Sequence, residues 1–164
     1  MTNSELTIIR QAIIKEIEGY EFYKMVAERE NNTKETKEAF LELAEEEFQH
    51  VRWLENMYSL VKSDKSENFE MANELDVPAP SNLKWKKIDK NSGSIAVAVF
   101  GIGIQMERAS IEYYTKAANE TKIESAKKFF MKLAKWEQAH LELLSKEYDE
   151  LLGEWWSEQG YAPF

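Results

Sequence analysis

The chain contains no cysteine, which excludes disulfides, thiolate zinc sites and iron–sulfur clusters. Proline and glycine are scarce, with 3 and 6 residues, and this scarcity favours helices over turn-rich folds. Basic residues are outnumbered by acidic ones, 21 against 30, so the net charge is −9. Nucleic acids and anionic membrane surfaces both require a basic face on their partner. We therefore expect neither as a partner of this chain.

Long apolar runs are also lacking. The longest, residues 95–104, is too short to span a bilayer. Residues 1–10 lack the basic start and apolar centre of a signal peptide, so we expect a cytoplasmic protein. A chain of 164 residues with 43% hydrophobic residues is long and apolar enough to form one compact domain with a buried core.

Helical periodicity is what the sequence does contain. Four segments repeat core-facing residues at alternating steps of three and four, as one face of an α-helix does: residues 4–30, 34–62, 94–119 and 124–152. The connections within each pair are short, and a long polar crossover, about 63–93, joins the pairs. This order predicts an all-α fold, a four-helix bundle of two antiparallel hairpins over residues 1–152. Residues 153–164 form an aromatic tail, which we expect to pack on this domain or on a second copy.

Residues 95–104 fit the helical pattern least well. They are rich in β-branched residues, which favour a strand, and they include Gly101 and Gly103. A lone strand would have no partner elsewhere in this sequence, so we predict a helix. The two glycines are then expected to allow either close contact between helices or a local π-bulge.

Charged residues occupy the middle of every predicted inward face. They are Glu16, Glu47, His50, Glu107, Glu137 and His140. An isolated carboxylate at such a position costs several kcal/mol of desolvation, a cost that bound metal ions would offset. Both histidines of the chain follow a glutamate by three residues, a spacing that brings the two side chains to one face of a helix. Carboxylate and imidazole ligands suit iron or manganese, and the ligand set does not choose between them.

Chance could produce the Glu-x-x-His spacing in helices this rich in glutamate, but it does not explain an internal repeat. Glu16 and Tyr23 recur 91 residues later as Glu107 and Tyr114. The segment 47–50 recurs 90 residues later as 137–140. One glutamate from each of two helices, with Glu-x-x-His from each of the other two, is the ligand pattern of di-iron carboxylate bundles. The register therefore predicts a dinuclear metal site.

At these positions the chain resembles the ferritin-like di-iron carboxylate superfamily, and within it the rubrerythrin branch. The resemblance covers about residues 6–152. It implies two iron ions, with manganese or a mixed pair as the alternative, bridged by Glu47 and Glu137. Glu16 and Glu107 would be terminal ligands, with one histidine for each metal. The resemblance also implies that Tyr23 and Tyr114 hydrogen-bond to the carboxylates, whereas packing alone is the alternative for these tyrosines.

Two departures from full-length rubrerythrins concern electron transfer and ligand exchange. Those proteins carry a four-cysteine rubredoxin domain, but this chain has no cysteine, so we expect a separate electron-donor protein. They also place an additional carboxylate three residues after the third-helix glutamate, where this chain has Ser110. The rubrerythrin route of peroxidase action is therefore in doubt for this chain.

The expected function is an oxidoreductase that reduces hydrogen peroxide or dioxygen, in the context of oxidative stress. A ferroxidase or iron-handling protein is the alternative, and iron storage would additionally require a cage-forming oligomer. A metal-free bundle that serves as an interaction module is disfavoured by the complete ligand set. A homodimer is the oligomeric state we expect.

Overall fold

The computed structural model describes residues 2–29, 32–69, 93–158 and 160. Four long helices account for nearly all of them: α1 (Thr2–Ala27), α2 (Lys34–Lys62), α3 (Gly93–Glu120) and α4 (Glu124–Glu158). A single 3₁₀ turn, η1 (Ser66–Asn68), follows α2. The described residues contain no strand, so the all-α prediction is confirmed.

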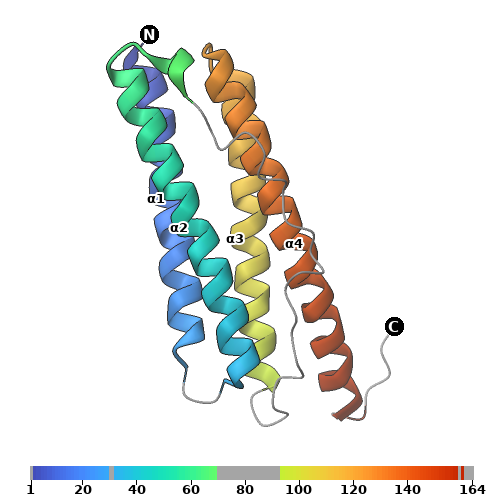
Figure 1. Cartoon of the computed structure of the whole chain (residues 1–164). Coiled ribbons are helices and arrows are strands. Elements are labelled where there is room, and N and C mark those ends of the chain that lie inside the picture. Colours follow the sequence, from blue (N-terminus) through green and yellow to red (C-terminus); the bar gives the residue numbers. More distant parts are fainter. Residues whose placement is uncertain (1, 30–31, 70–92, 159, 161–164) are drawn as a thin grey trace.

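The helices pair as two antiparallel hairpins, α1 with α2 and α3 with α4, which lie side by side as a bundle (Figure 1). Most of the predicted crossover, residues 70–92, lies outside the described residues, as do 159 and 161–164 of the aromatic tail. Among the helices that the structure describes, none combines the length and apolar character that a membrane span requires.

Two helix ends differ from their predicted positions by three residues or more. The α1 helix ends at Ala27 rather than at residue 30, because the side-chain amide of Asn32 donates hydrogen bonds to the carbonyl oxygens of Val26 and Ala27. At the other end of the chain, α4 continues to Glu158 instead of ending at residue 152. Gly153 does not stop this helix, since one interior glycine costs only about 1 kcal/mol relative to alanine.

Residues 95–104 belong to α3, as predicted, and the described residues show no π-bulge there. Close packing against α1 and α4 explains why residue 103 is a glycine. A Cβ atom on Gly103 would lie 3.2 Å from Leu144 Cδ1 on α4 and 3.7 Å from the Tyr23 ring on α1. The β-branched run is helical because burial in the bundle outweighs its local preference.

A buried carboxylate outside the predicted site ties the two hairpins together. Glu5, near the start of α1, is 5% exposed. It accepts hydrogen bonds from the Lys122 backbone N–H at 2.9 Å and from the Thr121 hydroxyl at 2.7 Å. These two residues lie between α3 and α4, so Glu5 fixes that turn against the first helix.

The apolar core is divided into two clusters with a polar layer between them. One cluster is built around Leu54, Tyr114, Phe130 and their neighbours, and the other around Tyr23, Phe40, Leu144 and theirs. On each helix the charged residues of the predicted site lie between the residues of the two clusters. The bundle thus encloses its most polar layer between two dry regions.

Candidate metal centre

The structure brings all six predicted site residues into this one layer. All are buried, with exposed fractions of 4% or less: Glu16, Glu47, His50, Glu107, Glu137 and His140. They form two overlapping groups whose ligand atoms lie within 4.8 Å of one another: Glu16, Glu47, His50 and Glu137, and Glu47, Glu107, Glu137 and His140. Glu47 and Glu137 belong to both groups, which is the position that bridging carboxylates would occupy.

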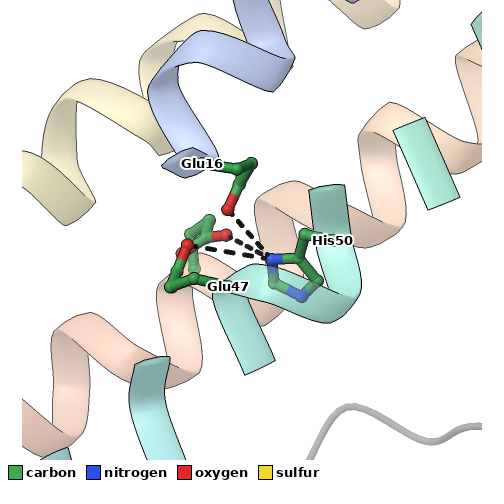
Figure 2. Close-up of side chains that lie close together, drawn as sticks. Glu16, Glu47 and His50 are labelled. Atoms are coloured by element: carbon green, nitrogen blue, oxygen red, sulfur yellow. Dashed lines mark hydrogen bonds and ion pairs between the residues drawn. The ribbon is translucent and has the colours of Figure 1, made fainter. Parts of the chain in front are cut away.

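The first group centres on His50 of α2. Its Nδ1 atom lies 3.2 Å from Glu16 Oε2 and 3.1 Å from Glu137 Oε1, while Glu47 Oε2 is 4.0 Å away. Figure 2 shows this nitrogen turned towards the carboxylates of Glu16 and Glu47, with the other ring nitrogen turned away. One nitrogen of His50 therefore lies close to carboxylates from two other helices and to that of Glu47, three residues earlier on α2.

The second group repeats this geometry around His140 of α4. The Nδ1 atom of His140 lies 3.1 Å from Glu47 Oε1, 3.3 Å from Glu137 Oε2 and 3.6 Å from Glu107 Oε1. The two imidazole rings are stacked, with centroids 6.3 Å apart. The internal repeat of the sequence has become an approximate twofold arrangement in space.

The two tyrosines complete the layer by crossing between hairpins. Tyr23 of α1 donates a hydrogen bond to Glu107 of α3, and Tyr114 of α3 donates one to Glu16 of α1. Each hydroxyl thus holds the glutamate that the resemblance treats as a terminal ligand. In Glu16 the other oxygen, Oε2, faces His50, whereas in Glu107 the oxygen that accepts from Tyr23 is also the one near His140.

Burial acts to raise the pKa values of all four glutamates, and their different neighbours separate these values into two pairs. Burial, followed by the charges of neighbouring carboxylates, raises the pKa values of Glu47 and Glu137 well above their ordinary range. Burial also opposes ionisation of Glu16, but hydrogen bonding from Glu47 and the nearby His50 outweigh it and lower the pKa of Glu16 to about 2. The pKa of Glu107 is lowered against burial in the same way, by Glu137 and His140.

Both histidines are more basic than usual. Burial opposes this, but Glu16 raises the pKa of His50, and Glu107 raises the pKa of His140. Without a metal, Glu47, Glu137 and both imidazoles therefore hold their protons to a higher pH than the free side chains do. Metal ions would displace those protons, because carboxylates and imidazoles coordinate in their deprotonated forms.

Several buried polar atoms of the layer lack a hydrogen-bond partner: Glu47 Oε1, both carboxylate oxygens of Glu137, His140 Nδ1 and His50 Nε2. Some lie 3.1 Å from an opposing nitrogen or oxygen, yet their angles do not fit a hydrogen bond. An unpaired buried polar group costs about 1–3 kcal/mol. Four of these five atoms face the shared centre, so the residues fit a metal pair. Their role as ligands stays a prediction.

Sequence reasoning missed Glu46, the residue before the bridging candidate Glu47. Its Oε2 atom lies 2.6 Å from His140 Nε2 and accepts a hydrogen bond of 2.8 Å from Trp136 Nε1. Burial works against ionisation of Glu46, but its pKa is lowered because it bonds to His140. Glu46 lies in a run of three glutamates, 45–47, and only Glu47 falls on the predicted inward face of the helix. No sequence pattern therefore singled out Glu46.

A small pocket between α1 and α3 reaches the layer. It has a volume of about 90 Å³ and is walled by α1 and α3, with Gly19 and Ser110 among its lining residues. Exposed Glu18 and buried Glu47 both line it, so it leads from the surface to the carboxylates. A Cβ atom on Gly19 would lie only 3.3 Å from Glu47 Oε2.

The comparisons with known proteins agree with this geometry. A solved structure of a hypothetical protein from Pyrococcus furiosus is 27% identical in sequence and superposes with a TM-score of 0.68. The alignment covers 91% of this chain and 90% of that one, and the shared fold is a ferritin-like four-helix bundle. No curated protein matches the chain. The family model described as Rubrerythrin matches residues 7–148, and because this match spans most of the chain, the chain belongs to the rubrerythrin family.

Proposed function

We propose that this protein is a di-iron oxidoreductase that reduces hydrogen peroxide or dioxygen with electrons from a separate donor. The observation that carries the proposal is the pair of overlapping buried groups around Glu47 and Glu137. Four buried carboxylates cost several kcal/mol each unless protons or cations neutralise them, so packing alone does not explain this layer. A layer that instead holds two metal ions uses every one of its inward-facing ligand atoms.

Iron is the metal we propose, on the strength of family membership and of a donor set made only of carboxylates and imidazoles. Glu16 and His50 would hold one ion, Glu107 and His140 the other, and Glu47 and Glu137 both. Bound there, a pair of reduced iron ions would supply the two electrons that convert hydrogen peroxide and two protons into two water molecules.

The protein's own residues hold the carboxylates in place, keep bulk water out and leave room for a small oxidant. Tyr23 and Tyr114 hold the outer carboxylates in place from opposite hairpins. The apolar clusters on both sides keep bulk water from the layer. The pocket beside Glu47 has room for dioxygen or hydrogen peroxide and is far smaller than the pockets of at least about 300 Å³ that hold drug-sized ligands.

Ser110 lines this pocket at the position where a further carboxylate would be needed for ligand exchange. A serine hydroxyl is a poor substitute, so we expect both histidines to remain ligands in both oxidation states. The donor of electrons is external to this chain, which contains no cysteine to hold a relay iron.

The test is stopped-flow oxidation of the anaerobically reduced, iron-loaded protein, with hydrogen peroxide and with dioxygen in separate experiments. Faster reaction with peroxide supports a peroxidase, and rapid dioxygen consumption with added Fe²⁺ supports the alternative, a ferroxidase. Glu137→Gln is the test variant, because it alters a carboxylate shared by both groups. Glu142→Gln, which alters an exposed glutamate on the same helix, is its matched control. Inertness of the loaded wild-type protein towards both oxidants would refute the proposed oxidoreductase function.

A further inference from the structure

The approximate twofold symmetry of the centre fails at the pair of positions that directly precede the shared glutamates. Glu46 precedes Glu47, and Trp136 precedes Glu137, so the two residues are 90 apart and equivalent in the repeat. One half of the repeat thus offers a carboxylate where the other half offers an indole. The six candidate ligands and the two tyrosines, by contrast, pair like with like.

The carboxylate of Glu46 reaches across from α2 to the outer nitrogen of His140 on α4. The distance between Glu46 Oε2 and His140 Nε2 is 2.6 Å. The indole of Trp136 donates to the same oxygen, which holds the carboxylate in place from the second side. With a metal bound at Nδ1, His140 would keep a single proton, on Nε2, and donate it to Glu46.

His50 has no such partner. Its Nε2 atom is buried and makes no hydrogen bond with any residue that the structure describes. Aromatic rings surround it instead: Trp53 stacks on the imidazole at a centroid distance of 5.8 Å, and Trp136 meets it edge-on at 5.2 Å. These rings fix the plane of His50 but provide no acceptor for its outer proton.

We propose that the two metal positions are unequal, and that Glu46 is the positioning residue that makes the position at His140 bind metal more tightly. The position at His50 is then the exchangeable one. A carboxylate that accepts the outer N–H of a ligand histidine fixes its tautomer and raises its basicity, and losing such a partner typically lowers metal affinity by 10- to 100-fold. The inference rests on the metal centre of the proposed function but not on its redox chemistry.

Charge alone could imitate this effect, since any nearby carboxylate attracts cations. The chain offers a matched control in Glu45, the adjacent glutamate on α2. Glu45 is exposed and bonds to Arg52 at 2.8 Å. Glu45→Gln and Glu46→Gln remove the same charge from neighbouring residues, but only the second removes the bond to His140.

The test is anaerobic titration of the metal-free protein with Co²⁺, followed by calorimetry and by the visible ligand-field spectrum. Wild-type protein should bind in two steps of unequal affinity. Glu46→Gln should weaken the tighter step about 10- to 100-fold and shift its spectrum, whereas Glu45→Gln should leave both steps unchanged. His50→Ala should retain the tighter step and His140→Ala should lose it, which assigns each step to a position.

Three results would overturn the inference while leaving the metal centre intact: two equal steps in the wild type, equal effects of Glu45→Gln and Glu46→Gln, or loss of the tighter step in His50→Ala rather than in His140→Ala. Failure to bind Co²⁺ at all would refute the centre and the inference together. Far-ultraviolet circular dichroism of each variant separates loss of a ligand partner from loss of fold.

Discussion

The hydroxyl of Tyr23 on α1 donates a hydrogen bond to Glu107 on α3, rather than to Glu16, which lies two turns away on its own helix. Tyr114 makes the reciprocal bond to Glu16. The two bonds link the hairpins at the level of the site, and each tyrosine ring belongs to a different apolar cluster. Packing and carboxylate orientation are thereby coupled.

Tyr23→Phe and Tyr114→Phe should therefore destabilise the protein to similar extents, by roughly 1.5–3 kcal/mol each, because each removes a hydrogen bond to a charged carboxylate. Urea unfolding of the metal-free protein measures this. Tyr113→Phe is the matched control, since Tyr113 donates to the neutral carbonyl of Ile8, and it should cost only about 1 kcal/mol. A larger loss for the control than for the two site variants would contradict the prediction.

Substitution of a proposed ligand residue should sharply reduce metal binding. We expect wild-type protein to bind about two metal ions per chain and expect His50→Ala or Glu137→Ala to reduce this sharply, because each removes a proposed ligand. Elemental analysis after dialysis measures the occupancy. Glu142→Ala, an exposed glutamate of the same helix, should retain full occupancy. Full loading of the two ligand variants would show that the residues are wrongly assigned.

Metal removal should lower the melting temperature. Ligands that bind only the folded state stabilise it by about 4 kcal/mol at a thousandfold excess over Kd, which corresponds to a shift on the order of 10 °C for a chain of this size. Differential scanning calorimetry of the metal-free and iron-loaded forms compares them directly. Identical melting temperatures would mean that the carboxylates do not surround a metal.

The stability of the metal-free protein should fall as pH rises from about 5 to 9. Glu47, Glu137 and both histidines have folded-state pKa values above their unfolded values, so the folded state binds more protons. Their stabilising contribution is complete below the unfolded pKa values and is lost as pH rises through the folded ones. The metal-loaded form contains no such protons, so its advantage in melting temperature should widen with pH.

Glu47→Gln provides the control for this pH dependence, because glutamine imitates the protonated acid at every pH. The metal-free variant should lose less stability between pH 5 and 9 than the wild type does. Thermal melts in matched buffers give both slopes, and a wild-type melting temperature that rises over this range would have the wrong sign.

Gly19→Ala should weaken metal binding without destabilising the metal-free fold. Alanine favours the helix interior by about 1 kcal/mol, so the metal-free variant should be no less stable than the wild type. The new methyl group would lie 3.3 Å from Glu47 Oε2 and inside the pocket, so it should weaken metal binding and slow the reaction with peroxide. Titration with Co²⁺ and stopped-flow oxidation measure the two losses. Gly153→Ala, at an open helical position, should change neither.

The sequence by itself determined the helices and which residues face inward. A phase of 3.6 residues per turn is a local property, so it aligns Glu47 with His50 and Glu137 with His140 without knowledge of the partner helices. The repeat then predicted that the two halves contribute equivalent ligands. The bounds of α2 also agree with its predicted range.

Only the tertiary structure decided which side chains meet across helices. The crossed pairing of Tyr23 with Glu107, the bond from Glu46 to His140 and the close approach of Gly19 to Glu47 all depend on the rotation and offset of one helix against another. Those quantities are set by how side chains interdigitate throughout the core, which no single helix encodes. The proposed inequality of the two metal positions depends on both: the repeat places Glu46 where its other half has Trp136, and only the packing of α2 against α4 brings Glu46 to His140.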